Sequence, residues 1–76
     1  MKWIITTDAT LAVRSDQVTQ LAITSYQRPE GQRWWVEVYV QDRGIFTVGD
    51  FTDREAAIDE LRHLLSQLQE AENEVD

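Results

Sequence analysis

Cysteine is absent from the 76 residues, which excludes a disulfide framework and a thiolate metal site. The three glycines, at positions 31, 44 and 49, stand apart, so the chain has no glycine-rich loop of the kind that cradles a phosphate. The only histidine, His63, lies beside the apolar stripe of a predicted helix, and no motif places a serine or cysteine nucleophile next to it. We therefore expect no catalytic residues, no metal ion and no cofactor, and we predict that the protein is not an enzyme.

Long apolar runs are missing as well. The run near the start of the chain, Trp3-Ile4-Ile5, has three residues. A secretory signal needs about 7–15 apolar residues and a membrane-spanning helix needs about 20. We therefore expect a cytoplasmic protein that has no membrane partner.

Basic residues are few, because seven lysines and arginines stand against fourteen acids and the net charge is −7. Phosphate contacts need clustered basic side chains, so we expect no direct binding to nucleic acid. The acidity is compatible with three interpretations, which the composition leaves open. It can serve solubility alone, attract a basic or nucleic-acid-binding protein, or imitate the charge of a nucleic-acid backbone.

The chain is long enough for one domain, residues 1–76, with room for one modest core. A hydrophobic content of 42% and three tryptophans are typical of a folded protein. We expect a sheet over residues 3–51, a helix over residues 53–70 and an acidic tail over residues 71–76. A domain of this size without a disulfide or metal needs tight packing, self-association or a partner.

Residues 33–41 carry the strongest pattern in the sequence, because their side chains alternate with the period of a β-strand. The even positions are all apolar: Trp34, Val36, Val38 and Val40. The odd positions mix aromatic, charged and polar side chains: Arg33, Trp35, Glu37, Tyr39 and Gln41. The apolar side is expected to form the core and the mixed side to face away from it.

Turn signals divide the rest of residues 3–51 into strands. Pro29–Gln32 is predicted to be a four-residue hairpin loop that places Arg28 opposite Arg33. Residues 42–44 are predicted to be a three-residue loop, with Gly44 in the left-handed position. The next strand then places Phe46 opposite Val40 and Phe51 opposite Trp35. The predicted fold is α+β, an antiparallel meander of about five strands (residues 3–7, 11–14, 19–28, 33–41 and 45–51) with one C-terminal helix on one face.

The helix has a clear start signal. Thr52 is the expected N-cap, and Glu55 follows three residues later to complete a capping box. Apolar residues at 57, 58, 61, 64, 65 and 68 then form one stripe at helical spacing. The acids after Leu68 oppose the helix dipole, so the tail is expected either to fray or to dock on a basic partner.

One helix can cover only one face of the sheet, which leaves an aromatic face. We predict that this face carries the protein-interaction site, formed by Tyr26, Arg33, Trp35, Glu37, Tyr39 and Phe51. Aromatic residues and arginine are enriched in binding hot spots. Two alternatives stay open: the first two strands curl over this face, or the face meets a protein partner, a second copy in a homodimer, or a small ligand.

The segment Phe51-Thr52-Asp53-Arg54-Glu55-Ala56-Ala57, behind its hairpin turns, resembles the start of the closing helix in very short bacterial and phage proteins built as a β-meander plus helix. The resemblance implies a non-enzymatic accessory or regulatory protein of a mobile element. Small acidic inhibitors of host nucleic-acid machinery, including anti-CRISPR proteins, are one such group. No site residue carries over from the resemblance.

The expected function is therefore that of a small acidic protein–protein interaction module, which the resemblance narrows to an inhibitor or regulator from a phage or mobile element. The alternative is a structural homo-oligomer, or a small-ligand-binding module, that uses the aromatic sheet face.

Overall fold

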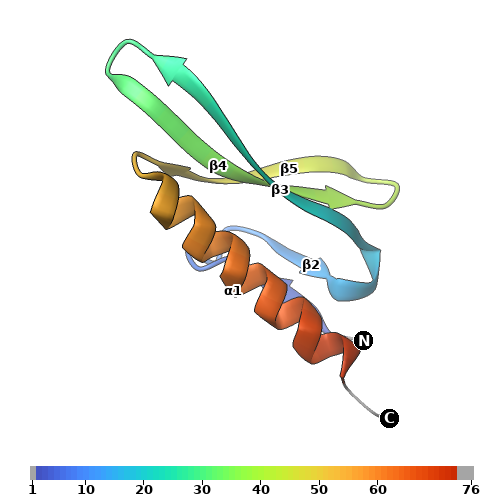
Figure 1. Cartoon of the computed structure of the whole chain (residues 1–76). Coiled ribbons are helices and arrows are strands. Elements are labelled where there is room, and N and C mark those ends of the chain that lie inside the picture. The colour runs from blue at the N-terminus through green and yellow to red at the C-terminus, as the bar shows by residue number, and fades with distance from the viewer. Residues whose placement is uncertain (1, 74–76) are drawn as a thin grey trace.

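The computed structural model describes residues 2–73 and shows an α+β fold with one C-terminal helix (Figure 1). The elements are β1 (Trp3–Ile5), β2 (Ala12–Arg14), the 3-10 turn η1 (Ser15–Gln17), β3 (Val18–Arg28), β4 (Gly31–Val40), β5 (Gly44–Phe51) and α1 (Arg54–Glu72). They form two antiparallel sheets, one of β1 and β2 and one with the order β3-β4-β5. The α+β class is confirmed, but the single five-stranded meander is wrong.

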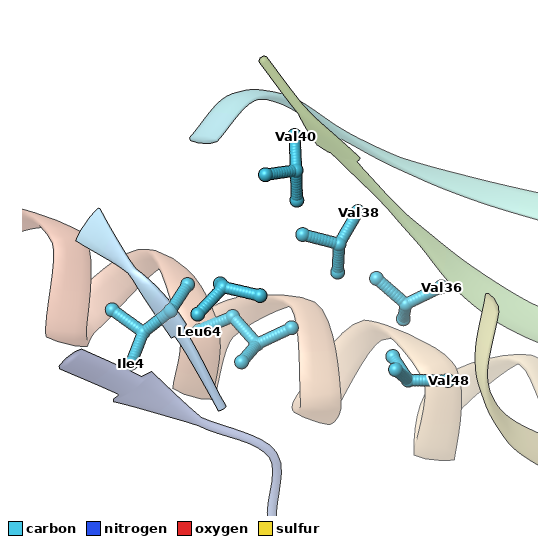
Figure 2. Close-up of a cluster of buried hydrophobic side chains, with 7 residues drawn as sticks. Ile4, Val36, Val38, Val40, Val48 and Leu64 are labelled. Atoms are coloured by element: carbon cyan, nitrogen blue, oxygen red, sulfur yellow. The ribbon is translucent and has the colours of Figure 1, made fainter. Parts of the chain in front are cut away.

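The chain divides into two sheets because η1 redirects it between β2 and β3. Ile4 and Val13 lie opposite each other in the β1–β2 hairpin, and both are buried in the same cluster as Val38 and Leu64. The hairpin therefore lies beside α1, on the same side of the three-stranded sheet (Figures 1 and 2). Burying one apolar residue from each short strand gives the hairpin its place in the core.

The β3–β4 register differs from the predicted one by two residues. Pro29 and Glu30 alone form the loop, and Arg28 pairs with Gly31. Gly31 has φ +135°, a conformation that favours glycine and lets the strand start directly after the loop. Leu21 consequently lies opposite Val38, whereas pairing Arg28 with Arg33 would have placed it opposite Val40. A shift of two residues keeps every side chain on its predicted face.

The β4–β5 register is shifted in the same way. The loop is formed by residues 41–43, and Val40 pairs with Gly44. Val38 therefore lies opposite Phe46, and the predicted pairing of Phe46 with Val40 is wrong. Asp42 and Gly44 both have a positive φ, +64° and +93°, so the predicted left-handed conformation of Gly44 is confirmed, although Gly44 begins β5 and does not end the loop.

The helix begins one residue later than predicted. Asp53 is the N-cap, and its side chain accepts a hydrogen bond from the backbone N–H of Glu55 at 3.1 Å. Thr52 is therefore not the cap, because the carboxylate of the next residue reaches this orphan N–H instead. The helix continues to Glu72, so the first two residues of the predicted acidic tail are helical, while residues 74–76 lie outside the described residues.

The core lies between the three-stranded sheet and a lower layer formed by α1 and the β1–β2 hairpin (Figure 2). Its largest fully buried side chains are Ile4, Leu64, Val36 and Val38. Each contributes about 1.5–3 kcal/mol by its removal from water. These residues come from β1, β4 and α1, so the core joins both layers.

Polar side chains of α1 close the outer edge of β1. Gln67 accepts a hydrogen bond from the Ile5 N–H at 2.9 Å and donates one to the Ile5 carbonyl at 2.8 Å. His63 Nε2 lies 3.1 Å from the same carbonyl. One turn earlier, buried Glu60 accepts from the backbone N–H and the hydroxyl of Thr7. His63 is exposed, and its contact joins Gln67 and Glu60 in attaching the hairpin to the helix.

Candidate protein-interaction face

The candidate site is the face of the β3-β4-β5 sheet that points away from α1, which we call the open face. It carries the predicted residues Tyr26, Arg33, Trp35, Glu37 and Tyr39. Both α1 and the β1–β2 hairpin lie on the opposite side, and no element of residues 2–73 covers the open face (Figure 1). The alternative in which the first two strands curl over this face is therefore wrong.

Near the β3–β4 loop, the open face carries an aromatic pair with an arginine. The rings of Tyr26 and Trp35 have centroids 4.4 Å apart and planes tilted by 59°. The guanidinium carbon of Arg28 lies 4.8 Å from the Tyr26 centroid, a cation–π distance. Tyr26 pairs with Arg33 in the register and Trp35 with Thr24. The two rings are therefore diagonal neighbours and not directly opposed, as they would be with Arg28 opposite Arg33.

An ion pair borders these rings. Arg33 donates two hydrogen bonds to Asp50, from Nε and from one terminal nitrogen, both at 3.0 Å. This bidentate contact lowers the pKa of Asp50 below its ordinary value of 3.8 and raises the pKa of Arg33. Arg33 is also the register partner of Tyr26, so the ion pair lies next to the aromatic pair.

Phe51 does not belong to the open face. A β-bulge lies between Trp34 and Val36 in the register, and Phe51 pairs with Trp34, on the helix side. Gly49, with φ +78°, forms the bulge, and a Cβ added there would lie 2.2 Å from the Phe51 ring. The extra residue turns Phe51 to the other face and brings Asp50 beside Arg33. The prediction that Phe51 lies opposite Trp35 on the aromatic face is therefore wrong.

The two remaining predicted residues lie along β4 beyond the aromatic pair. Glu37 accepts a hydrogen bond from the Thr24 hydroxyl across the strand pair. Tyr39 lies opposite Ile45 of β5, and Ile45 is 54% exposed. Trp35 and Tyr39 are four residues apart on one strand, or roughly 13 Å. The structure thus brings Tyr26, Arg33 and Trp35 together and places Tyr39 apart from them, opposite Ile45.

Two residues of the site were missed by the sequence prediction, Arg28 and Asp50. Arg28 stands two residues after Tyr26 on the same strand, so the strand period alone could have placed it on this face. Asp50 could not be placed, because only the bulge at Gly49 brings it there. With both included, the open face carries two arginines and two carboxylates and is close to neutral.

The acidic charge of the protein lies mainly elsewhere. Exposed acids on and beside the helix are Asp53, Glu55, Asp59, Glu70 and Glu72. Two buried donors of the open face, Nε1 of Trp35 and Nε of Arg28, have no hydrogen-bond partner within residues 2–73. The open face therefore presents aromatic rings whose nearby donors are shielded from solvent, while the helix side carries most of the exposed acids.

Within residues 2–73, no group of three or more histidine or acidic side chains is arranged to hold a metal ion. The helix in the described part of the chain is neither long nor apolar enough to cross a membrane. Comparisons with protein-family models, with curated proteins and with solved structures found no match to this chain.

Proposed function

We propose that this chain is a non-enzymatic protein-binding module whose open face docks on another protein. The observation that carries the proposal is the Tyr26–Trp35 pair with Arg28 stacked on it, on a sheet face that no described element covers. Tyrosine, tryptophan and arginine are the residues that dominate binding hot spots. Contiguous apolar surface on a monomer commonly marks an interaction site.

The shape of the face favours a protein over a small molecule as its partner. Small ligands bind in concave sites that bury most of their surface. The principal grooves of residues 2–73 lie beside α1 or beside the β1–β2 hairpin, and none is lined by Tyr26, Trp35 or Tyr39. A twisted sheet face with large anchors and a charged border instead resembles the centre and rim of a protein interface.

The charged and aromatic residues of the open face are expected to have different roles in binding. Arg33 and Asp50 already form an ion pair with two hydrogen bonds, so we expect this pair to remain intact at the rim of the interface. Trp35 and Tyr26 supply the apolar area that a partner buries. Nε1 of Trp35 and Nε of Arg28 are shielded from solvent, so we expect a partner to contact the rings and not these two donors.

The proposal is tested by affinity capture from the native host with the wild-type chain and with Trp35→Ala. Trp3 offers a matched control, because it is 57% exposed and lies on the β1–β2 hairpin, away from the open face. A protein partner retained by the wild type and by Trp3→Ala is expected to lose about 30-fold or more in affinity for Trp35→Ala. Equal binding of the partner by all three chains, with circular dichroism showing that they are folded, would rule out the open face.

A narrower form of the proposal makes the chain an inhibitor or regulator of nucleic-acid machinery. It is supported by the net charge of −7 together with the exposed acids of α1, which attract basic surfaces. In this form the captured partner is itself a nucleic-acid-binding protein. Nucleic acid added in excess is expected to compete with the chain for that partner, and competition should weaken as salt increases.

A further inference from the structure

An apolar groove runs between the second half of α1 and the first residues of β3. It has a volume of about 280 Å³ and is lined chiefly by Val18, Leu21, Leu61, Leu65 and Leu68. A second hollow of about 530 Å³ continues it toward the end of the helix and shares Val18, Leu65 and Leu68 with it. The helix residues that line the two parts extend from Leu61 to Glu72, a length of about 17 Å.

The walls of this groove are fixed by the core, while its surface stays open. Val18, Leu21, Leu61 and Leu68 are partly buried and pack against the core cluster. Leu65, which neighbours Leu61 and Leu68 on the helix surface, is 45% exposed. The groove is therefore a preformed apolar surface with one uncovered leucine, and such surfaces receive the apolar face of a helix from another protein.

The end of the groove at the C-terminus of α1 is negatively charged. Asp16 and Glu72 line it, whereas no lysine or arginine of residues 2–73 lines either part of the groove. Glu72 has no basic partner within these residues. The last turn of α1 also contains no basic residue that could offset the negative end of the helix dipole. This end of the groove therefore favours a positive charge.

Two basic residues stand near this end, and both are already paired. Lys2 lies 3.4 Å from Glu70, outside the groove. Arg14 lies 3.3 Å from one oxygen of Asp16 and lines a separate hollow. Three carboxylates thus face two bases, and Glu72 is left uncompensated beside the helix C-terminus.

We infer that a basic amphipathic helix of another protein occupies this groove. Its apolar side chains cover Leu65, and a lysine or arginine at one end reaches Glu72 and the last carbonyls of α1. The length fits, because about 17 Å corresponds to three turns of a helix. The net charge of −7 adds long-range attraction for such a partner. The groove lies on the helix side of the sheet, so this inference does not rest on the proposed function of the open face.

Two other occupants fit this groove less well. A strand added to β3 needs a regular backbone, but the register of β3 shifts between Val18 and Gln20, at the groove itself. A second copy of the chain has the wrong charge, because α1 carries five acids and two arginines. The apolar stripe of α1 is also already packed against the core.

The test is a binding measurement on the full chain with synthetic peptides of about 18 residues. The probe is a labelled leucine–lysine peptide with its leucines on one helical face, and binding is read by fluorescence anisotropy. The wild type is expected to bind it with a Kd of about 10–100 µM, and more weakly as salt increases. Two control peptides are expected to bind at least about tenfold more weakly: one with glutamate in place of lysine, and one with the leucines spread around the helix.

The apolar contact is tested by Leu65→Ala, which is expected to weaken binding of the leucine–lysine peptide about tenfold. Alanine preserves helix propensity, so the variant is expected to stay folded, as circular dichroism checks. Ile45→Ala is the matched control, because Ile45 is 54% exposed but lies opposite Tyr39 on the open face. It is expected to bind the peptide like the wild type.

The charge contact is tested by Glu72→Lys, which is expected to weaken binding about tenfold and to reduce its salt dependence. Asp59→Lys changes the net charge equally, but Asp59 is exposed on α1 and lines neither part of the groove. It therefore separates a local contact from the overall charge and is expected to retain most of the affinity.

Several results would overturn the inference. One is a wild type that does not bind the leucine–lysine peptide at about 500 µM. Others are equal binding of the glutamate peptide, or binding that either Leu65→Ala or Glu72→Lys leaves unchanged. A wild-type dimer that the peptide dissociates would make a second copy the occupant. Trp35→Ala is expected to bind the peptide normally, so failure of the groove and failure of the open face are distinguishable.

Discussion

The two faces of β4 are made by neighbouring residues and yet have opposite properties. On the helix side, Val36 and Val38 are fully buried, and Val40 is 6% exposed. On the open face, Trp35 and Tyr39 have larger apolar side chains but remain only half-buried. The comparison teaches that size does not decide which side chain stabilises this fold. A side chain of β4 stabilises the fold when α1 and the β1–β2 hairpin cover the face on which it lies.

The largest expected effect tests this comparison directly. Val38→Ala is expected to lower the free energy of unfolding by about 2–3 kcal/mol, because it removes two buried methyl groups and leaves a cavity. Tyr39→Ala removes a much larger side chain from the open face and is expected to cost about 1 kcal/mol or less. Urea denaturation of both variants measures the difference. A greater loss for Tyr39→Ala would mean that the open face is part of the core.

The bulge at Gly49 gives the next effect, since it determines which face receives Phe51. Gly49→Ala is expected to cost about 2 kcal/mol, because the new Cβ meets the Phe51 ring at 2.2 Å and the backbone has φ +78°. Gly44→Ala is the matched control: its φ is +93°, but nothing lies within 4 Å of the added Cβ, so only backbone strain of about 1 kcal/mol remains. Thermal denaturation compares the two. Equal losses would show that contact with Phe51 is unimportant.

The smallest expected effect is on stability at acid pH. It compares a carboxylate on the open face with one in the β1–β2 loop. Arg33 lowers the pKa of Asp50 on the open face, and hydrogen bonds from Thr10 and Thr6 lower the pKa of Asp8 in the β1–β2 loop. A depressed pKa in the folded state means that the contribution to stability is complete above the ordinary value of 3.8 and is lost as pH falls through the folded value.

Melting temperatures of the wild type are therefore expected to fall below about pH 4, with a shallower fall for Asp50→Asn and for Asp8→Asn. Both carboxylates are at the surface, so each difference should be small. An unchanged slope for Asp50→Asn would show that the Arg33 pair contributes nothing to folding.

Much of the fold was predictable because its signals are local. The alternation of Trp34 to Val40 predicted the two faces of β4, and the helical stripe predicted α1 to within two residues at each end. Tyr26, Arg33, Trp35, Glu37 and Tyr39 were placed on the open face by the same strand period. Each of these inferences depends only on neighbours in the chain.

The errors share one physical origin, which is that a strand pattern repeats every two residues. A hairpin shifted by two residues presents the same side chains to the same faces, so the pattern could not distinguish the loop Pro29–Glu30 from a loop of four residues. The predicted face of Phe51 was wrong for a related reason. A bulge inserts one residue into the strand and so reverses which side chains point to which face. No local signal located that bulge between Gly49 and Asp50.

By itself, the sequence of β4 determined which side chains share a face, because the pleat of an extended chain separates odd from even residues. Only the tertiary structure decided what each face meets. The β1–β2 hairpin could pack over either face, and it joins α1 because Ile4 and Val13 complete the core there while Gln67 closes the edge of β1. That choice of side leaves the aromatic face of β4 open.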